Sequence, residues 1–179
     1  LLEFVHDADD HIDVGVLGGR VIFHVLSEFG YSELAYKMIT RSDYPSYGNW
    51  IERGATTLWE DFLPDSVRSA NHHFWGDISA WFIKVLSGIN YNPTGRNLSE
   101  VLISPHFVLQ LENAHGYYDS PFGKISSSWE RKGKNVVIEI QSPDDMKVIL
   151  KLSDGYSFED KTYEKTFLGN KKIIAIKEI

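Results

Sequence analysis

Seven consecutive residues, 54–60 (GATTLWE), carry side chains that could handle a carbohydrate. They combine a glycine, two threonine hydroxyls, the indole of Trp59 and the carboxylate of Glu60. An aromatic face packs against the apolar C–H face of a sugar ring, and a neighbouring carboxylate can take a proton from water or attack the anomeric carbon. The spacing therefore favours carbohydrate chemistry, with Glu60 as the reactive group.

The same residues also fit a purely structural pattern. Residues 57–60 (TLWE) match the capping box, in which a threonine and a glutamate close the N-terminus of a helix reciprocally. In that interpretation Glu60 is a cap, Trp59 is a partly buried aromatic residue, and a short helix follows Thr57. Both interpretations stay open, because a cap and a catalytic carboxylate do not exclude each other.

Composition limits the classes of function. The chain has 179 residues, 42% of them hydrophobic and 13% aromatic, which is typical of an ordered globular protein with one good domain or two small ones. A formal charge of −7 without a basic stripe argues against nucleic-acid binding. The absence of cysteine excludes disulfides and thiolate metal sites. Asp77 and Lys84 interrupt the most apolar segment, so we expect no membrane span. The first residue is Leu1 and not methionine, so the compartment is left open.

Helical periodicity dominates the first half. Apolar residues recur at helical spacing over residues 14–29, and Gly30 is a plausible C-cap. A second helix from Ser32 completes a predicted helical hairpin, and residues 73–86 predict a third helix that Gly88 ends. Between them, the loop 43–57 interleaves aromatic residues, among them Trp50. Such loops often line pockets, so Trp50 is a candidate substrate contact, with packing onto the helix ends as the alternative.

The second half has the period of β-strands. Pro93 and Gly95 mark a boundary, which divides the chain into residues 1–92 and 93–179. Beyond it, apolar residues alternate over residues 136–140 and 146–152, and turn residues separate these runs. Several short strands at this spacing predict an antiparallel β-sandwich, so the fold class is α+β.

Residues 6–13 concentrate carboxylates and imidazoles, which raises the question of a metal site. The spacing matches neither a zinc pattern nor an EF-hand, and acidic residues before a helix interact favourably with its dipole. We therefore predict neither a metal nor a cofactor.

Several motifs together resemble one family. In the helical half they are YPSYG at 44–48, GATTLWE at 54–60, SANHHFWG at 69–76, WF at 81–82 and LSGI at 86–89. HIDVGVLG at 11–18 precedes them, and ISP at 103–105, YDSPFG at 118–123 and ISSSW at 125–129 follow. In this order and spacing the set resembles the bacterial α-L-rhamnosidases of glycoside hydrolase family 78. The resemblance covers roughly residues 11–129.

The resemblance implies a fold and a reaction. The fold is the last helices of an (α/α)6 barrel followed by an antiparallel β-sandwich, and the reaction is the hydrolysis of terminal α-L-rhamnose with inversion. Glu60 aligns with the family's general base and Trp59 with its neighbouring aromatic residue. His72 matches a histidine that touches the sugar, and His11 falls near the sugar pocket. The implied partner is a rhamnose-containing oligosaccharide or glycoside, with no nucleic acid and no membrane.

The sequence departs from the family at the general acid. The family places this glutamate in an Arg-Asp-Glu-Arg-like segment, and no such segment occurs in the 179 residues. Glu28, Glu33 and Glu52 lie in contexts that do not match it. We therefore expect a C-terminal fragment of a larger glycosidase that is inactive alone. Helix faces left uncovered in a barrel fragment would favour self-association, for example as a homodimer.

Two other functions remain open at this point. Another (α/α)-barrel glycosidase, trehalase-like or glucoamylase-like, would cleave glucosides in place of rhamnosides. A non-catalytic carbohydrate-binding or structural module would bind glycans through the sandwich, with Glu60 as a helix cap only.

Overall fold

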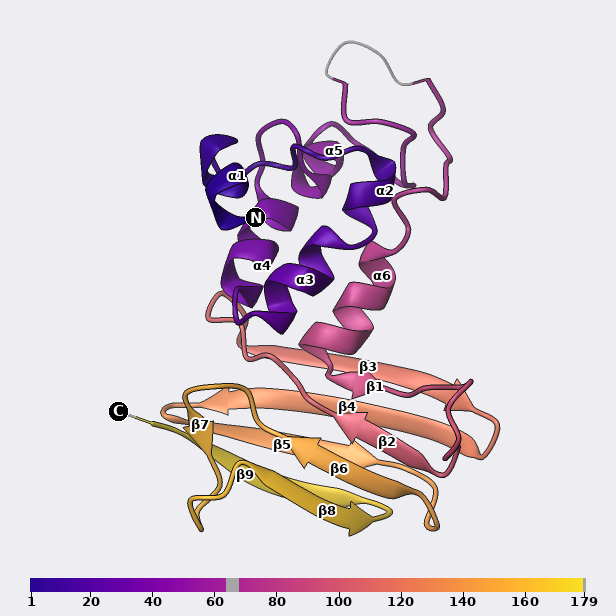
Figure 1. Ribbon diagram of the computed structural model, residues 1–179, viewed down its shortest axis with the longest axis vertical. Coiled ribbons are helices and arrows are strands. Elements are labelled where there is room, and N and C mark those ends of the chain that lie inside the picture. The colour runs from indigo at the N-terminus through magenta and orange to yellow at the C-terminus, as the bar shows by residue number, and fades with distance from the viewer. Residues whose placement is uncertain (64–67, 179) are drawn as a thin grey trace. The chain divides into compact units, whose positions relative to one another are not determined.

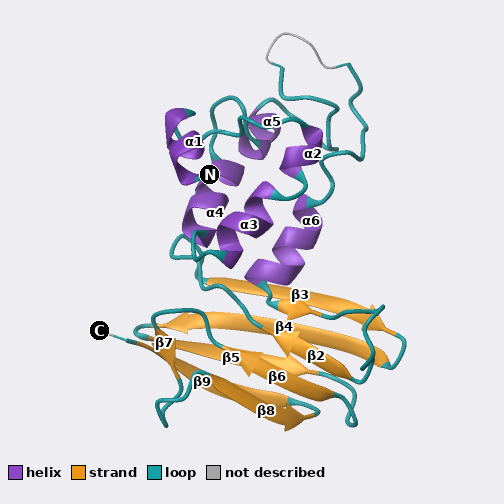
Figure 2. Cartoon of the chain, viewed as in Figure 1, coloured by secondary structure: helices purple, strands orange, loops and turns teal. Residues whose placement is uncertain are grey.

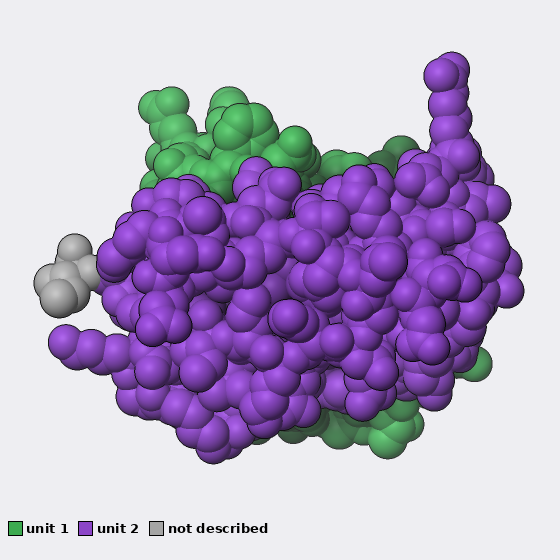
Figure 3. Space-filling view, turned by 90° about the horizontal axis from the view of Figure 1, so that it is seen from below, with its two compact units in different colours: residues 1–81 green, residues 82–179 purple. Residues whose placement is uncertain are grey.

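The computed structural model describes residues 1–63 and 68–178. The chain forms two compact units, Leu1–Trp81 and Phe82–Ile179, which Figure 3 shows in separate colours. The first unit is helical and the second consists mainly of strands, as Figure 2 shows. The division falls earlier than the expected boundary after residue 92, because residues 82–90 form a π-helix and a strand that pack with the sheets.

Short helices build the first unit, and their order can be followed in Figure 1. They are α1 (Leu2–Asp7), α2 (Val16–Gly19), α3 (Ile22–Glu28), α4 (Ser32–Thr40), α5 (Tyr47–Glu52) and α6 (Ile78–Trp81). The predicted hairpin of α3 and α4 is confirmed, since the two helices pack together and Gly30 between them has φ +87°.

The helix predicted over residues 14–29 is wrong in its extent. It is broken into α2 and α3, and Leu17 and Val21 are 77% and 55% exposed. Two consecutive glycines weaken the helix at the break. Gly19 is also needed where it stands, because a Cβ there would lie 2.3 Å from Cζ3 of Trp75. Close packing of an aromatic ring therefore requires glycine at this position.

Aromatic rings form the core of the first unit around Tyr47. Its ring makes edge-to-face contacts with the rings of Phe23, Trp50, Phe62 and Trp75, at centroid distances between 5.3 and 6.4 Å. The Tyr47 hydroxyl donates to the carbonyl of Trp75 at 3.0 Å. Burial raises the pKa of this phenol, so it remains a neutral donor. These contacts join segments that are distant in sequence.

The helix predicted over residues 73–86 begins later than expected. Residues 74–77 are turns, α6 covers Ile78–Trp81, and the π-helix η1 (Phe82–Leu86) continues the chain. Phe74 and Phe82, expected on the buried face, are 48% and 38% exposed. A π-turn changes the angular spacing of side chains, so a strict 3.6-residue pattern misplaces them.

Two sheets make up the second unit. Their strands are β1 (Ile89–Asn90), β2 (Glu100–Ile103), β3 (Asn113–Ser120), β4 (Gly123–Lys132), β5 (Asn135–Gln141), β6 (Lys147–Lys151), β7 (Tyr156–Ser157), β8 (Glu164–Leu168) and β9 (Lys171–Lys177). The orders are β1-β2-β6-β8 and β3-β4-β5-β9-β7. The predicted antiparallel pairing holds except between β2 and β6, which are parallel.

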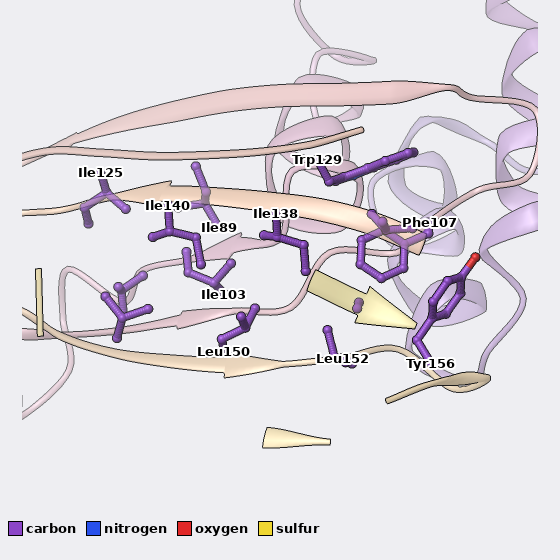
Figure 4. Close-up of a cluster of buried hydrophobic side chains, with 14 of the residues drawn as sticks. Ile89, Ile103, Phe107, Ile125, Trp129, Ile138, Ile140, Leu150, Leu152 and Tyr156 are labelled. Carbon is purple, nitrogen blue, oxygen red and sulfur yellow. The ribbon is translucent and has the colours of Figure 1, made fainter. Parts of the chain in front are cut away.

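The alternating residues predicted to point inward do form the core of this unit. Val136, Ile138 and Ile140 of β5 are at most 1% exposed and belong to the cluster shown in Figure 4. Trp129 lies in the same cluster, and its indole donates to the carbonyl of Leu86 at 2.7 Å. Within the described residues, no helix is both long enough and apolar enough to cross a membrane.

Candidate active site

The segment that carries Trp59 and Glu60 has no regular secondary structure and lies against residues 69–72. The Glu60 amide donates to the carbonyl of Ser69 at 3.0 Å, and the His72 amide donates to the carbonyl of Leu58 at 2.8 Å. The Thr57 hydroxyl donates to the carbonyl of Ala70. No helix follows Thr57 in residues 58–63, so the capping-box interpretation is wrong. Pairing across a loop satisfies the backbone groups that a helix would otherwise have used.

Two indoles hold the backbone at the candidate base. Trp75 donates from Nε1 to the carbonyl of Glu60 at 2.9 Å, and Trp50 donates from Nε1 to the carbonyl of Asp61 at 3.1 Å. The Glu60 side chain is only partly buried. Among the described residues, its carboxylate takes part in no hydrogen bond or ion pair. Glu60 therefore combines a fixed backbone with a carboxylate that is available to a ligand or to water.

Trp50 and Trp59 are more deeply buried than a sugar platform requires. Their exposed fractions are 2% and 9%. The ring of Trp50 stacks on Phe62 at 4.2 Å, and the guanidinium of Arg53 lies over the ring of Trp59 at 4.9 Å. Trp50 thus packs against neighbouring residues, which is the alternative to a substrate contact, and its indole holds the backbone carbonyl of Asp61. Contact of either tryptophan with a substrate stays a prediction.

One ring nitrogen of His72, Nε2, has no hydrogen-bond partner among the residues that the structure describes. Its Nδ1 accepts a hydrogen bond from the Phe74 amide at 3.3 Å, and its ring meets that of Phe74 edge to face at 4.1 Å. Because Nδ1 is the acceptor, the neutral ring carries its proton on Nε2, where it can be donated. A hydroxyl group is a suitable acceptor for this proton. His72 does not begin a helix, since α6 starts at Ile78.

His11 lies on a cavity that neither Glu60 nor His72 lines. Its Nε2 is 3.1 Å from Oδ2 of Asp43, and its Nδ1 is 3.2 Å from the carbonyl of Ala8. Arg41 donates to both oxygens of Asp43 at 2.8 and 2.7 Å, and these bonds hold the pKa of the Asp43 carboxyl well below its usual range. Three of the acidic and histidine residues near the N-terminus, His6, Asp10 and His11, are engaged in ion pairs. The described residues contain no group of three that could hold a metal.

The cavity at His11 has a volume of about 620 Å³ and is lined in part by Asp13, Tyr44, Asp61 and Trp75. It contains His11 but not Glu60, Trp59 or His72, although Asp61 directly follows Glu60. The structure therefore brings Glu60 and His72 together on paired segments and places His11 on the neighbouring cavity.

Sequence reasoning missed the supporting role of Trp75. The residue lies in one of the quoted motifs, but its hydrogen bond to Glu60 crosses a loop whose shape is not encoded locally. The aromatic ring of Phe62 was missed for the same reason, although its stacking on Trp50 holds that indole against Asp61.

Comparison with known families identifies both units. Residues 1–86 match the family model described as "bacterial alpha-L-rhamnosidase 6 hairpin glycosidase domain". Residues 88–165 match the family model described as "bacterial alpha-L-rhamnosidase C-terminal domain".

Curated proteins and solved structures agree with these matches. An alpha-L-rhamnosidase of Formosa agariphila is 30% identical over 99% of this chain and 20% of its own length. One of Alteromonas sp. is 31% identical over 80% of this chain and 16% of its own length. The structure of the alpha-L-rhamnosidase from Dictyoglumus thermophilum has a TM-score of 0.83 at 25% identity, over 99% of this chain and 22% of that one. The chain thus spans about a fifth of the length of these relatives.

Proposed function

This chain belongs to the bacterial α-L-rhamnosidases, and we propose that it supplies one half of an active site that hydrolyses terminal α-L-rhamnose with inversion. In this proposal Glu60 is the general base. The proposal for the whole protein's reaction rests on the relatives, whose printed names are alpha-L-rhamnosidase. The function as a trehalase-like or glucoamylase-like enzyme has no comparable support among them.

The observation that carries the role of Glu60 is its combination of a fixed backbone and a carboxylate that has no hydrogen-bond or ion-pair partner among the described residues. A general base must reach a water molecule at hydrogen-bond distance, and a carboxylate already paired with a cation would be a poorer acceptor. The carbonyl of Glu60 is held by Trp75 at 2.9 Å, so the carboxylate starts from a defined position. This arrangement fits a base better than a structural carboxylate, which would have a partner.

Two carboxyl groups share the work in an inverting glycosidase. One protonates the leaving oxygen, and the other takes a proton from a water molecule on the opposite face of the sugar, at a separation of roughly 6.5–9.5 Å. Glu28 and Glu52 are exposed on α3 and α5, and neither lines the cavity beside Asp61. We propose that the acid lies outside these 179 residues and that the chain alone is inactive.

His72 and His11 take the role of binding groups in this proposal. The Nε2–H of His72 would donate to a rhamnose hydroxyl, on the segment that pairs with the one carrying Glu60. His11 would contribute from the adjacent cavity, where its ring is held by Asp43 and by the carbonyl of Ala8. Trp59 would present to the sugar only the small part of its ring that is exposed.

The test is the release of rhamnose from an aryl α-L-rhamnoside by the full-length protein, by its Glu60→Gln variant and by the 179-residue chain. We expect the substitution to lower turnover by about 10²–10⁴, the range for a lost general base. Glu52→Gln is the matched control, because Glu52 is an exposed glutamate on the nearby helix α5. Full activity of Glu60→Gln would refute its role as the general base. Turnover by the 179-residue chain would refute the proposal that the general acid lies outside these residues.

Self-association of the isolated chain is a separate part of the proposal. Large apolar side chains are exposed on the first unit, notably Phe4 at 75%, Leu17 at 77% and Phe29 at 72%. Exposed apolar side chains of this size promote association between copies. Sedimentation of the 179-residue chain at increasing concentration should show a dimer or larger species, and a strict monomer would contradict this.

A further inference from the structure

A second cavity lies beside Phe74 and is separate from the cavity at His11. It has a volume of about 300 Å³ and is lined by Val16, Leu17, Arg20, His73, Phe74 and Asp77. Phe74 connects it to the candidate site, because the Phe74 ring meets the ring of His72 at 4.1 Å. Its volume is at the lower end of the range for ligand pockets.

The two cavities are neighbours that share no lining residue. Along the chain, Gly15 lines the first cavity and Val16 the second. Likewise, Trp75 lines the first cavity and Phe74 the second. The backbone therefore passes from one cavity to the other at two places, between Gly15 and Val16 and between Phe74 and Trp75.

The second cavity contains the groups that bind a sugar ring. Phe74 is 48% exposed, so its ring offers an apolar face for C–H groups. Asp77 is held in place because His24 approaches its Oδ2 with Nε2 at 2.9 Å. Its Oδ1 has no hydrogen-bond or ion-pair partner among the residues described, and neither has the guanidinium of Arg20. A carboxylate and a planar guanidinium are suited to a pair of adjacent hydroxyls.

We propose that this second cavity binds the sugar residue to which the scissile rhamnose is attached, on the leaving-group side. The inference rests on the proposed function, which places rhamnose at Glu60 and His72. A sugar fits the cavity better than a flat apolar leaving group, because Arg20, His73 and Asp77 make half of its lining polar or charged. Phe74 and Arg20 are then specificity-determining residues, and they take no part in bond cleavage.

The experiment compares two substrates in the full-length protein. One is α-L-rhamnosyl fluoride, whose leaving group is too small to occupy the cavity. The other is the disaccharide α-L-rhamnosyl-(1→6)-D-glucose, whose glucose would occupy it. We expect Arg20→Ala to lower kcat/KM for the disaccharide by about tenfold, the scale of a lost contact in a specificity pocket, and to leave kcat/KM for the fluoride unchanged. Phe74→Ala also removes the ring that contacts His72, so it should lower kcat/KM for both substrates, and the value for the disaccharide by more.

Phe29→Ala is the control, since Phe29 is an exposed phenylalanine of the same unit, at 72% against 48% for Phe74, and lines neither cavity. It should change neither value. Equal losses on both substrates, or no loss on the disaccharide, would overturn the inference. Wild-type protein that cleaves neither substrate would instead contradict the proposed function, so the two failures can be told apart.

Discussion

The indole Nε1–H of Trp75 donates to the backbone carbonyl of Glu60 at 2.9 Å. The bond ties the turn before α6 to the segment that carries the candidate base. The other side of the same indole packs closely on Gly19 of α2, so a single ring joins three separate segments at the site. The position of Glu60 therefore depends on how tightly this ring is packed.

Replacing Trp75 by phenylalanine removes the donor and keeps most of the apolar ring. We expect kcat on α-L-rhamnosyl fluoride to fall by about tenfold or more while KM changes little, because a small displacement of a catalytic group is costly. Trp81→Phe is the control. Its indole donates to the carbonyl of Phe23 and to the Ser27 hydroxyl, so a similar hydrogen bond is lost away from Glu60. Equal effects of the two variants on kcat would contradict the positioning role of Trp75.

Gly19→Ala tests the packing of the same ring. The added Cβ would lie 2.3 Å from Cζ3 of Trp75, so the ring must shift, and overpacking of this kind lowers the free energy of unfolding by about 1–3 kcal/mol. Urea unfolding of the 179-residue chain measures the loss. Gly15→Ala is the comparison, because a Cβ there would meet nothing within 4 Å. A loss for Gly15→Ala as large as that for Gly19→Ala would show that steric conflict is not the cause.

His72 and His73 provide a comparison between adjacent residues. On α-L-rhamnosyl fluoride we expect His72→Ala to lower kcat/KM by about tenfold, the scale of a hydrogen bond lost to a buried hydroxyl. His73→Ala should have a much smaller effect, since His73 lines the second cavity, which the fluoride leaves empty. A larger loss of kcat/KM for His73→Ala than for His72→Ala would show that His72 is not the histidine that contacts the sugar.

The Arg41–Asp43 pair predicts a pH dependence. Hydrogen bonds from Arg41 hold the pKa of Asp43 below its ordinary value of about 3.9, so the pair stabilises the fold above that pH and loses its effect as the pH falls through the lowered pKa. We expect Arg41→Gln to raise the pKa of Asp43 towards the ordinary value, as followed by NMR titration.

Asp160 in the second unit is the internal reference for that titration. Hydrogen bonds from Lys165 and Thr162 lower its pKa to about 2, and Arg41 plays no part in this. The Asp160 titration should therefore be the same in both proteins. A shift of Asp160, or an unchanged Asp43, would contradict the assignment of Arg41 as the main cause.

The sequence by itself determined those features that depend on local period and on motif order. Alternation over residues 136–140 placed three apolar side chains of β5 in the core, because side chains of a strand point to opposite faces in turn. The order of the motifs indicated the family, and Glu60 was a candidate from its neighbours alone. The hairpin of α3 and α4 followed from its spacing and from Gly30.

Only the tertiary structure decided which of two local patterns would form at residues 57–60. The sequence there matches a helix start, but the backbone groups of Glu60 and His72 bond across the loop, and the partners lie outside any local window. The ring of Trp75 likewise leaves no room for a side chain at Gly19, and the parallel pairing of β2 with β6 joins strands far apart in the chain. Local periodicity gives each segment a preference for helix or strand. Where two conformations have similar free energies, contacts with distant segments select one of them.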